Sequence, residues 1–165
     1  MDSLYDISLE QSILTTLVGS LDDDIYTAVD GLLDSDDFYH KRHKYIFDAV
    51  ASLAQSSQPH DAVMVLSELQ NKGLYEQAGG EEYLMEILQR LGSSRHHLES
   101  YAKQVKELSK RLSVFNKLKE AQESLLNLQQ GVDDVWDGVN SSVNDVLSSE
   151  INKTSYDSTE AYELW

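Results

Sequence analysis

The sequence contains no cysteine and only one proline among its 165 residues. Without cysteine, neither a disulfide framework nor a thiolate zinc site can form. No run of eighteen or more apolar residues occurs, which argues against a membrane-spanning helix. The first residues, from Met1 to Asp6, are acidic and lack the basic segment that opens a signal peptide. These absences lead us to expect a cytoplasmic protein.

Motifs for catalysis and for cofactor binding are also missing. There is no GxxxxGK[ST] loop, so no cradle for nucleotide phosphates is expected. His40 and His43 lie one helical turn apart, but no third ligand accompanies them, so we expect no metal site. The acidic groups at residues 22–24 and 36–37 are interpreted as helix caps and solvated surface, not as catalytic carboxylates or a calcium loop. We therefore predict a chain without catalytic residues, cofactor or metal.

Positive charge is scarce. The net charge is −16, and ten Asp or Glu residues precede the first base, Lys41. A field of this sign repels phosphate, so autonomous DNA binding is not expected. The acidic surface could instead attract a basic protein partner, or it could simply keep the chain in solution. The charge pattern leaves both interpretations open.

Apolar residues at helical spacing predict about five short helices within residues 1–92. Short connections and the lack of alternating strand patterns indicate an all-α compact bundle, which we call the head. The residues that predict where these helices begin are a capping box at Ser8 and Gln11, the acidic groups Asp22–Asp24 and Asp36–Asp37, the N-cap Asp61 and the tight turn Gly79–Gly80. The residues that predict where a helix ends are Pro59 and Gly73. The helix after Asp37 is expected to place Phe38 and Tyr39 in the core.

A different pattern follows the head. Residues 94–130 contain neither Gly nor Pro, and their apolar residues alternate at spacings of three and four, as in a coiled-coil seam. After Gly131 a second helical segment follows, so we predict a long antiparallel hairpin over residues 93–150. Residues 151–165 are expected to be the start of a linker, with a new helix near Ser158. The residues predicted to mediate self-association are Leu98, Tyr101, Val105, Leu108, Leu112 and Phe115 on the first arm and Val135, Trp136, Val139 and Val143 on the second.

The first arm of this hairpin is basic. Between Lys103 and Lys119, six bases accompany a single acid, Glu107. These bases could pair with the acidic second arm, although each exposed pair stabilises by only about 0–1 kcal/mol. They could also make a weak contact with nucleic acid or an acidic partner. The candidates for such a contact are Lys103, Lys106, Lys110 and Arg111.

A series of short motifs supports a more specific interpretation. In order they are Ser8-Leu9-Glu10-Gln11, Asp36-Asp37-Phe38-Tyr39, His43 with Ile46-Phe47-Asp48-Ala49, Gln58-Pro59-His60-Asp61, Gly73-Leu74, Gly79-Gly80-Glu81-Glu82-Tyr83-Leu84, and Tyr101-Ala102 before Val105-Lys106-Glu107. In order and spacing, the series resembles the amino-terminal domain of bacterial or phage DnaB-type replicative helicases. The resemblance extends over about residues 8–150.

This resemblance implies a non-catalytic role in oligomerisation and partner docking. In that family, hairpins pair two heads, three pairs form a collar on a hexamer, and primase or a helicase loader docks there. The parent protein would be an ATP-dependent 5'–3' DNA helicase that uses ATP and Mg²⁺, with its motor beyond the linker helix that we expect near Ser158. Two alternatives stay open at this point. One is a complete phage or mobile-element protein that regulates a host helicase, and the other is an unrelated coiled-coil adaptor.

Overall fold

The computed structural model describes the backbone of residues 3–163 and the side-chain surroundings of residues 3–148. The described residues form six α-helices and two short 3-10 helices, without strands, which confirms the predicted all-α fold. None of these helices has the length and apolar character needed to cross a membrane. In chain order the elements are α1 (Ile7–Gly19), η1 (Ile25–Ala28), η2 (Ser35–Asp37), α2 (Lys41–Gln55), α3 (Ala62–Asn71), α4 (Gly80–Leu88), α5 (Arg95–Leu125) and α6 (Val132–Glu163).

The chain divides into two compact units, Met1–Ser109 and Lys110–Trp165. The predicted boundary after residue 92 therefore lies earlier than the boundary in the structure. The reason is that the first turns of α5 carry core residues of the head, namely Leu98, Ala102 and Val105, which are all buried. We use "head" below for the unit up to Ser109 and "hairpin" for the unit from Lys110.

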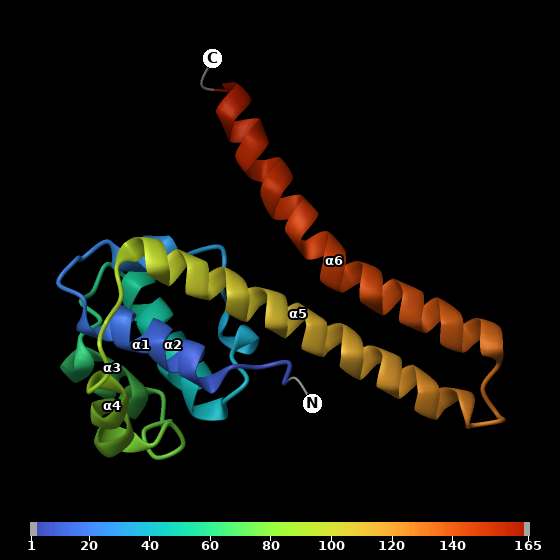
Figure 1. Cartoon of the computed structure of the whole chain (residues 1–165), viewed down its shortest axis with the longest axis horizontal. Helices are drawn as coiled ribbons and strands as arrows, with labels where there is room; N and C mark the ends of the chain where they lie inside the picture. The colour runs from blue at the N-terminus through green and yellow to red at the C-terminus, as the bar shows by residue number, and fades with distance from the viewer. Residues whose placement is uncertain (1–2, 164–165) are drawn as a thin grey trace. The chain divides into compact units, whose positions relative to one another are not determined.

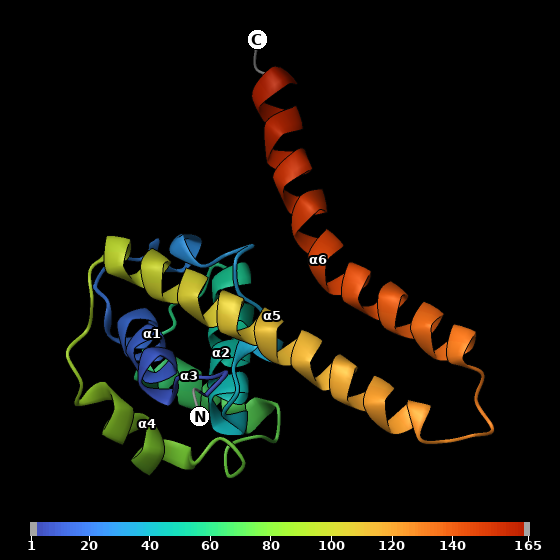
Figure 2. The same cartoon turned by 45° about the vertical axis from the view of Figure 1, so that its right-hand side comes forward.

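Helix α1 is the centre of the head. It is in contact with α2, α3 and α4 (Figures 1 and 2). All six side chains from Ile13 to Val18 are buried, including two threonines. A helix that is buried on all sides needs partners for its polar groups, and the Thr15 hydroxyl donates to the Ile87 carbonyl at 2.7 Å.

The helix boundaries confirm some of the expected signals and correct others. Asp61 accepts a hydrogen bond from the Met64 amide at 2.9 Å and caps α3, and Gly73 has φ +70° just after the end of that helix, both as predicted. The cap predicted at Ser8 is wrong. Helix α1 begins two residues earlier, at Ile7, and its N-cap is Asp6, whose carboxylate accepts a hydrogen bond from the Leu9 amide at 3.0 Å.

The helix predicted to follow the acidic group Asp22–Asp24 is reduced to the short η1. Asp22 accepts a hydrogen bond from the Asp24 amide at 2.9 Å, which offers the chain a turn in place of a helical start. Ile25, Val29 and Leu33 are nevertheless buried. The apolar pattern therefore identified the core residues correctly but assigned them the wrong secondary structure.

The expectation that both aromatic residues after Asp37 enter the core is half right. Phe38 is fully buried and packs against Phe47, with ring centroids 4.8 Å apart. Tyr39 is exposed and stacks on Tyr5, with ring centroids 3.7 Å apart. This difference follows from the extended backbone at Phe38, since successive side chains in extended chain point to opposite sides.

The hairpin consists of the end of α5 and the whole of α6, joined by residues 126–131. Figures 1 and 2 both show the first part of α6 running beside the end of α5 in the opposite direction. The backbone of α6 continues through residues 151–158, where we expected a linker, so the predicted helix start at Ser158 is not seen in the described backbone. The side chains of the predicted linker lie outside the described residues.

Candidate functional site

The hairpin has an apolar surface that its own two helices do not cover. Between residues 110 and 148, whose side chains are described, no residue is buried. Isolated helices are marginally stable in water and gain most of their stability from packing of an apolar face. The large apolar residues exposed on this unit are Phe115, Leu118, Leu125, Leu126, Leu128, Val132, Trp136 and Leu147.

These side chains recur at helical spacing on each arm. On α5, Phe115 and Leu118 are three residues apart, and on α6 Val132 and Trp136 are four apart. Positions three and four apart lie on the same face of a helix. Trp136 is 66% exposed, which is unusual for a large aromatic side chain. An exposed apolar stripe of this kind is typical of a surface that binds another protein chain.

The structure divides the predicted self-association residues into three groups. Leu98 and Val105 lie in the core of the head, where they are only 0% and 3% exposed, so they are not part of a self-association surface. Tyr101 packs against the same core. Leu108, Leu112, Val135, Val139 and Val143 are half-buried, while Phe115 and Trp136 are exposed. The heptad pattern indicated one seam, whereas α5 buries its first part in its own head.

The predicted basic contact residues also differ from one another. The Lys106 ammonium lies 3.0 Å from Oδ2 of Asp37. The Ser109 hydroxyl donates to the other oxygen of that carboxylate at 2.8 Å. This ion pair and this hydrogen bond link α5 to η2, so Lys106 has a structural role inside the head. Lys103 lines a groove together with Asp6 and Glu107, and Lys110 and Arg111 have interactions within the chain.

A buried polar network inside the head was missed by the sequence analysis. The Glu10 carboxylate accepts from the Tyr39 amide at 2.8 Å and the His40 amide at 3.2 Å, and it lies 2.8 Å from Nδ1 of His43. Glu10 and His43 are 2% and 0% exposed. Because an ionised carboxylate only accepts hydrogen bonds, Nδ1 of His43 is the donor in that pair.

The signal for this network was nevertheless present in the sequence. Glu10 lies three residues before Ile13, and His43 lies three residues before Ile46, so each occupies the buried stripe of its helix. A charged or polar residue at such a position requires partners. The partners could not be named, because Glu10 and His43 are far apart in sequence and meet only when α1 and α2 pack together.

Ring nitrogens of both His40 and His43 have partners within the head. His40 is the N-cap of α2, where Nδ1 accepts from the Arg42 amide at 3.2 Å. Burial lowers the pKa of His40, and the neighbouring His43 and Arg42 lower it further. Among the described residues no group of three or more His, Asp or Glu side chains could hold a metal ion.

Comparisons with known proteins agree with this architecture. Residues 2–107 match the family described as "DnaB-like helicase N terminal domain". The chain is 36% identical over 103 residues to the replicative DNA helicase DnaC of Bacillus subtilis, covering 62% of this chain and 22% of that protein. It is also 36% identical over 83 residues to the replicative DNA helicase DnaB of Mycobacterium leprae, covering 50% of this chain and 13% of that protein.

A solved structure extends the likeness beyond the head. The N-terminal domain of DnaB helicase from Mycobacterium tuberculosis superposes with a TM-score of 0.77 at 25% identity, and the match covers 87% of this chain and 99% of that one. The chain thus spans about a fifth or less of the full-length relatives and nearly the whole of a solved amino-terminal domain. We conclude that this chain belongs to the family of DnaB-like helicase N-terminal domains.

Proposed function

We propose that this chain is the non-catalytic oligomerisation and partner-docking domain of a replicative DNA helicase. The observation that carries the proposal is the hairpin, in which no described residue is buried although eight large apolar side chains are exposed. A second copy of the hairpin is the proposed cover for this surface. Family membership argues against the unrelated coiled-coil adaptor.

In the full-length parent, three hairpin-paired dimers would make a hexamer that carries ATP-dependent motor domains. Primase or a helicase loader would dock on the collar of heads, in the cytoplasm. The negative charge of the head favours a basic partner, because residues 1–92 contain seventeen Asp or Glu and five Lys or Arg. Complementary charge accelerates encounter between proteins more than it strengthens the final complex. The chain itself would neither hydrolyse ATP nor bind nucleic acid strongly.

Analytical ultracentrifugation over a range of concentrations tests the self-association. The variant Trp136→Asp places a charge in the exposed apolar stripe of α6, and we expect it to weaken the dimer by about tenfold or more. The matched control is Leu21→Asp, because Leu21 is a fully exposed apolar residue of the head. A chain that stays monomeric at high concentration, or equal effects of the two variants, would rule out the hairpin dimer.

Leu108→Asp is a poorer test of the same idea. Leu108 is half-buried and lines a groove with Tyr5 and Leu9 of the head. A charge there would disturb the packing of the head, and loss of self-association could then follow from partial unfolding. Trp136 and Phe115 avoid this ambiguity because both side chains are exposed on the hairpin.

A further inference from the structure

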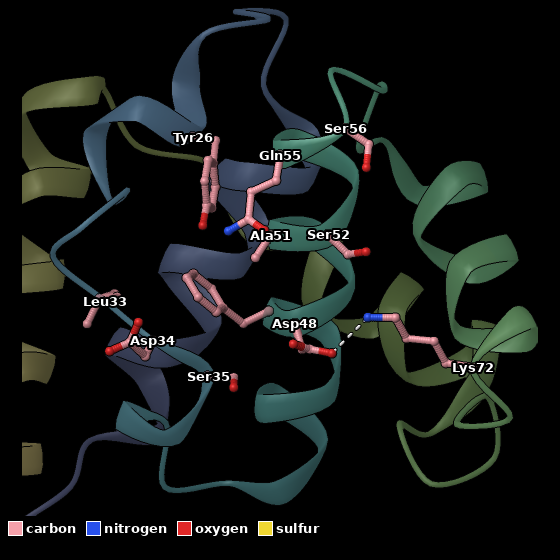
Figure 3. A pocket seen from close by; sticks show the side chains of 11 residues that line it. Tyr26, Leu33, Asp34, Ser35, Asp48, Ala51, Ser52, Gln55, Ser56 and Lys72 are labelled. Carbon is pink, nitrogen blue, oxygen red and sulfur yellow. Dashed lines mark hydrogen bonds and ion pairs between the residues drawn. The ribbon is translucent and has the colours of Figure 1, made fainter.

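The pocket shown in Figure 3 lies on the head between the segment from η1 to η2 and α2, and its side chains are already engaged within the chain. Tyr26 and Phe47, which line it, are only 8% and 1% exposed and belong to the core. Asp48 pairs with Lys72, with Oδ2 and the ammonium nitrogen 2.9 Å apart. This pocket therefore offers little to a partner, in contrast to a groove elsewhere on the head.

That groove lies between the segment before α1 and the first turns of α5, and it has a volume of about 530 Å³. Its apolar side chains are Tyr5, Leu9 and Leu108, of which the two leucines are half-buried and Tyr5 is exposed. The Tyr5 ring is held in place by its stack on Tyr39. All residues that line the groove belong to the head. The groove thus presents apolar surface large enough to take an aliphatic side chain from another chain.

The tip of the hairpin, residues 126–131, exposes two leucines. Leu126 and Leu128 are 83% and 95% exposed. The tip is nevertheless an ordered turn, because Oδ1 of Asn127 accepts from the Gln129 amide at 3.1 Å and the Asn127 carbonyl accepts from the Gln130 amide at 3.0 Å. Turns are usually built from Gly, Pro, Asn, Asp and Ser. A held turn that carries two bare leucines is therefore suited to insertion into an apolar groove, at a small cost in lost flexibility.

Helix α5 carries the groove at one end and the tip at the other. It contributes Leu108 to the groove and ends at Leu125, immediately before the tip. From Leu108 to Leu125 the helix rises roughly 26 Å, at 1.5 Å per residue, so a tip does not reach the groove of its own chain. Phe115 and Leu118 lie between these two residues on α5 and are exposed. A second copy whose hairpin runs antiparallel along this stretch brings its tip to the groove.

Charge favours the antiparallel direction over the parallel one. A parallel pair would bring two tips together, and α6 carries Asp133 and Asp134 in its first turn. It would also bring together two heads with seventeen acids against five bases each in residues 1–92. An antiparallel pair separates both sets of like charges. It also brings the two aspartates of one copy toward Lys103 in the groove of the other, and such complementary charges fix the register of a contact.

We propose that the groove of each copy receives the hairpin tip of a second copy, with Leu128 against Tyr5, Leu9 and Leu108. The contact is reciprocal, because a two-fold axis places each tip in the groove of the other chain. It extends the self-association surface from the hairpin onto the head. The inference rests on the hairpin dimer proposed above, and it adds the direction of the pairing and the residues at its two ends.

Cross-linking through introduced cysteines tests the direction, because the chain has no cysteine of its own. The variant that combines Gln104→Cys in the groove with Gln129→Cys at the tip should give a covalent dimer with a short bismaleimide. The two positions of one chain lie too far apart along α5 to be joined within it. The matched control combines Gln129→Cys with Gln77→Cys, since Gln77 is an exposed glutamine of the head outside the groove, and it should give little covalent dimer.

The single variant Gln129→Cys distinguishes the two directions of pairing. In an antiparallel pair the two tips lie at opposite ends of the dimer, so this variant should form no covalent dimer. In a parallel pair the tips adjoin and the cysteines react with each other. A covalent dimer of the single variant, or equal yields from the two double variants, would overturn the proposal.

A matched pair of leucine variants tests the contribution of the tip. Leu128→Ser should weaken self-association by about tenfold, because it removes the side chain that the groove buries. Leu91→Ser changes another leucine that is 93% exposed, outside the groove, and should have less than about a twofold effect. Sedimentation measures both, and circular dichroism verifies that each variant folds. Equal effects would contradict the insertion of Leu128.

The same measurements separate this inference from the hairpin proposal. If the parent chain dimerises and Trp136→Asp dissociates it, while Leu128→Ser has no effect and the groove variant is not cross-linked, the hairpin dimer stands and the tip contact falls. If the parent chain stays monomeric at high concentration, both fall. Loss of affinity in both Trp136→Asp and Leu128→Ser, together with cross-linking of the groove variant alone, is the result that we expect.

Discussion

Nε2 of His43 lies 2.7 Å from the hydroxyl oxygen of Tyr83, and both residues are buried in the head. His43 comes from α2 and Tyr83 from α4, and Glu10 of α1 occupies the other side of the imidazole. One side chain thus joins three helices at the centre of the domain. Since Nδ1 donates to Glu10, Nε2 accepts the Tyr83 proton when the ring is neutral.

Removing the Tyr83 hydroxyl should therefore cost stability. The variant Tyr83→Phe keeps the ring but leaves Nε2 of a fully buried histidine without its partner, which costs about 1–3 kcal/mol. Chemical denaturation measures the loss. Tyr39→Phe is the control, because Tyr39 is 49% exposed, and it should change the free energy of unfolding by less than about 0.5 kcal/mol. If both variants lost the same free energy of unfolding, the buried hydrogen bond between Tyr83 and His43 would not stabilise the head more than an exposed hydroxyl does.

The cap of α2 should make stability depend on pH. Folding lowers the pKa of His40, so below the ordinary histidine pKa the unfolded chain binds more protons than the folded chain. Stability should therefore fall as the pH decreases from the ordinary histidine pKa toward the lower pKa of folded His40, and it should be regained above the ordinary histidine pKa. Protonation also removes the lone pair with which Nδ1 caps the Arg42 amide.

The variant His40→Asn tests this dependence. Asparagine is a good helix cap that does not titrate, so melting temperatures between pH 5 and pH 7.5 should vary less than in the parent chain. His96→Asn, at an exposed position of α5, should leave the parent's pH dependence unchanged. An identical pH profile for His40→Asn and the parent would exclude His40 as the source.

The attachment of α5 to the head should depend on Asp37. Its carboxylate accepts from Lys106, Ser109 and the Asp34 amide, and it is only 9% exposed. Asp37→Asn removes the charge and should destabilise the head by about 1–3 kcal/mol, with faster hydrogen exchange in α5 near Lys106. Asp36→Asn, whose partner Lys44 lies 4.0 Å away, should cost under about 0.5 kcal/mol. Similar losses in the two variants would contradict this role.

Gly79 is expected to tolerate no side chain. Its φ is +92°, and a Cβ at this position would lie 2.6 Å from Cβ of Tyr83. Gly79→Ala should therefore destabilise the chain by more than about 1 kcal/mol, through strain and through displacement of the Tyr83 ring. Gly19→Ala is the control, because a Cβ there meets nothing within 4 Å. Thermal unfolding compares the stability of the two variants. If Gly79→Ala were as stable as the parent chain, the turn at Gly79 would accept a side chain and the prediction would be wrong.

Much of the architecture could be predicted from local patterns. Pro59, Asp61 and Gly73 mark helix boundaries through their own backbone chemistry, and the apolar stripes predicted an all-α chain without reference to anything distant. The hairpin could be predicted for the same reason, because a segment without Gly or Pro stops at Gly131 and a second helical pattern follows, although α5 itself ends earlier, at Leu125. These features depend on residues close together in the sequence.

The tertiary structure decided which partner each apolar or polar face meets. A heptad pattern shows that one face of α5 is buried, but only packing showed that Leu98 and Val105 belong to the head while Phe115 stays exposed. Similarly, Glu10 and His43 were visible as polar residues on buried stripes, yet their mutual bond required α1 and α2 to meet. Periodicity identifies a buried face, whereas the identity of its partner depends on contacts between segments far apart in the chain.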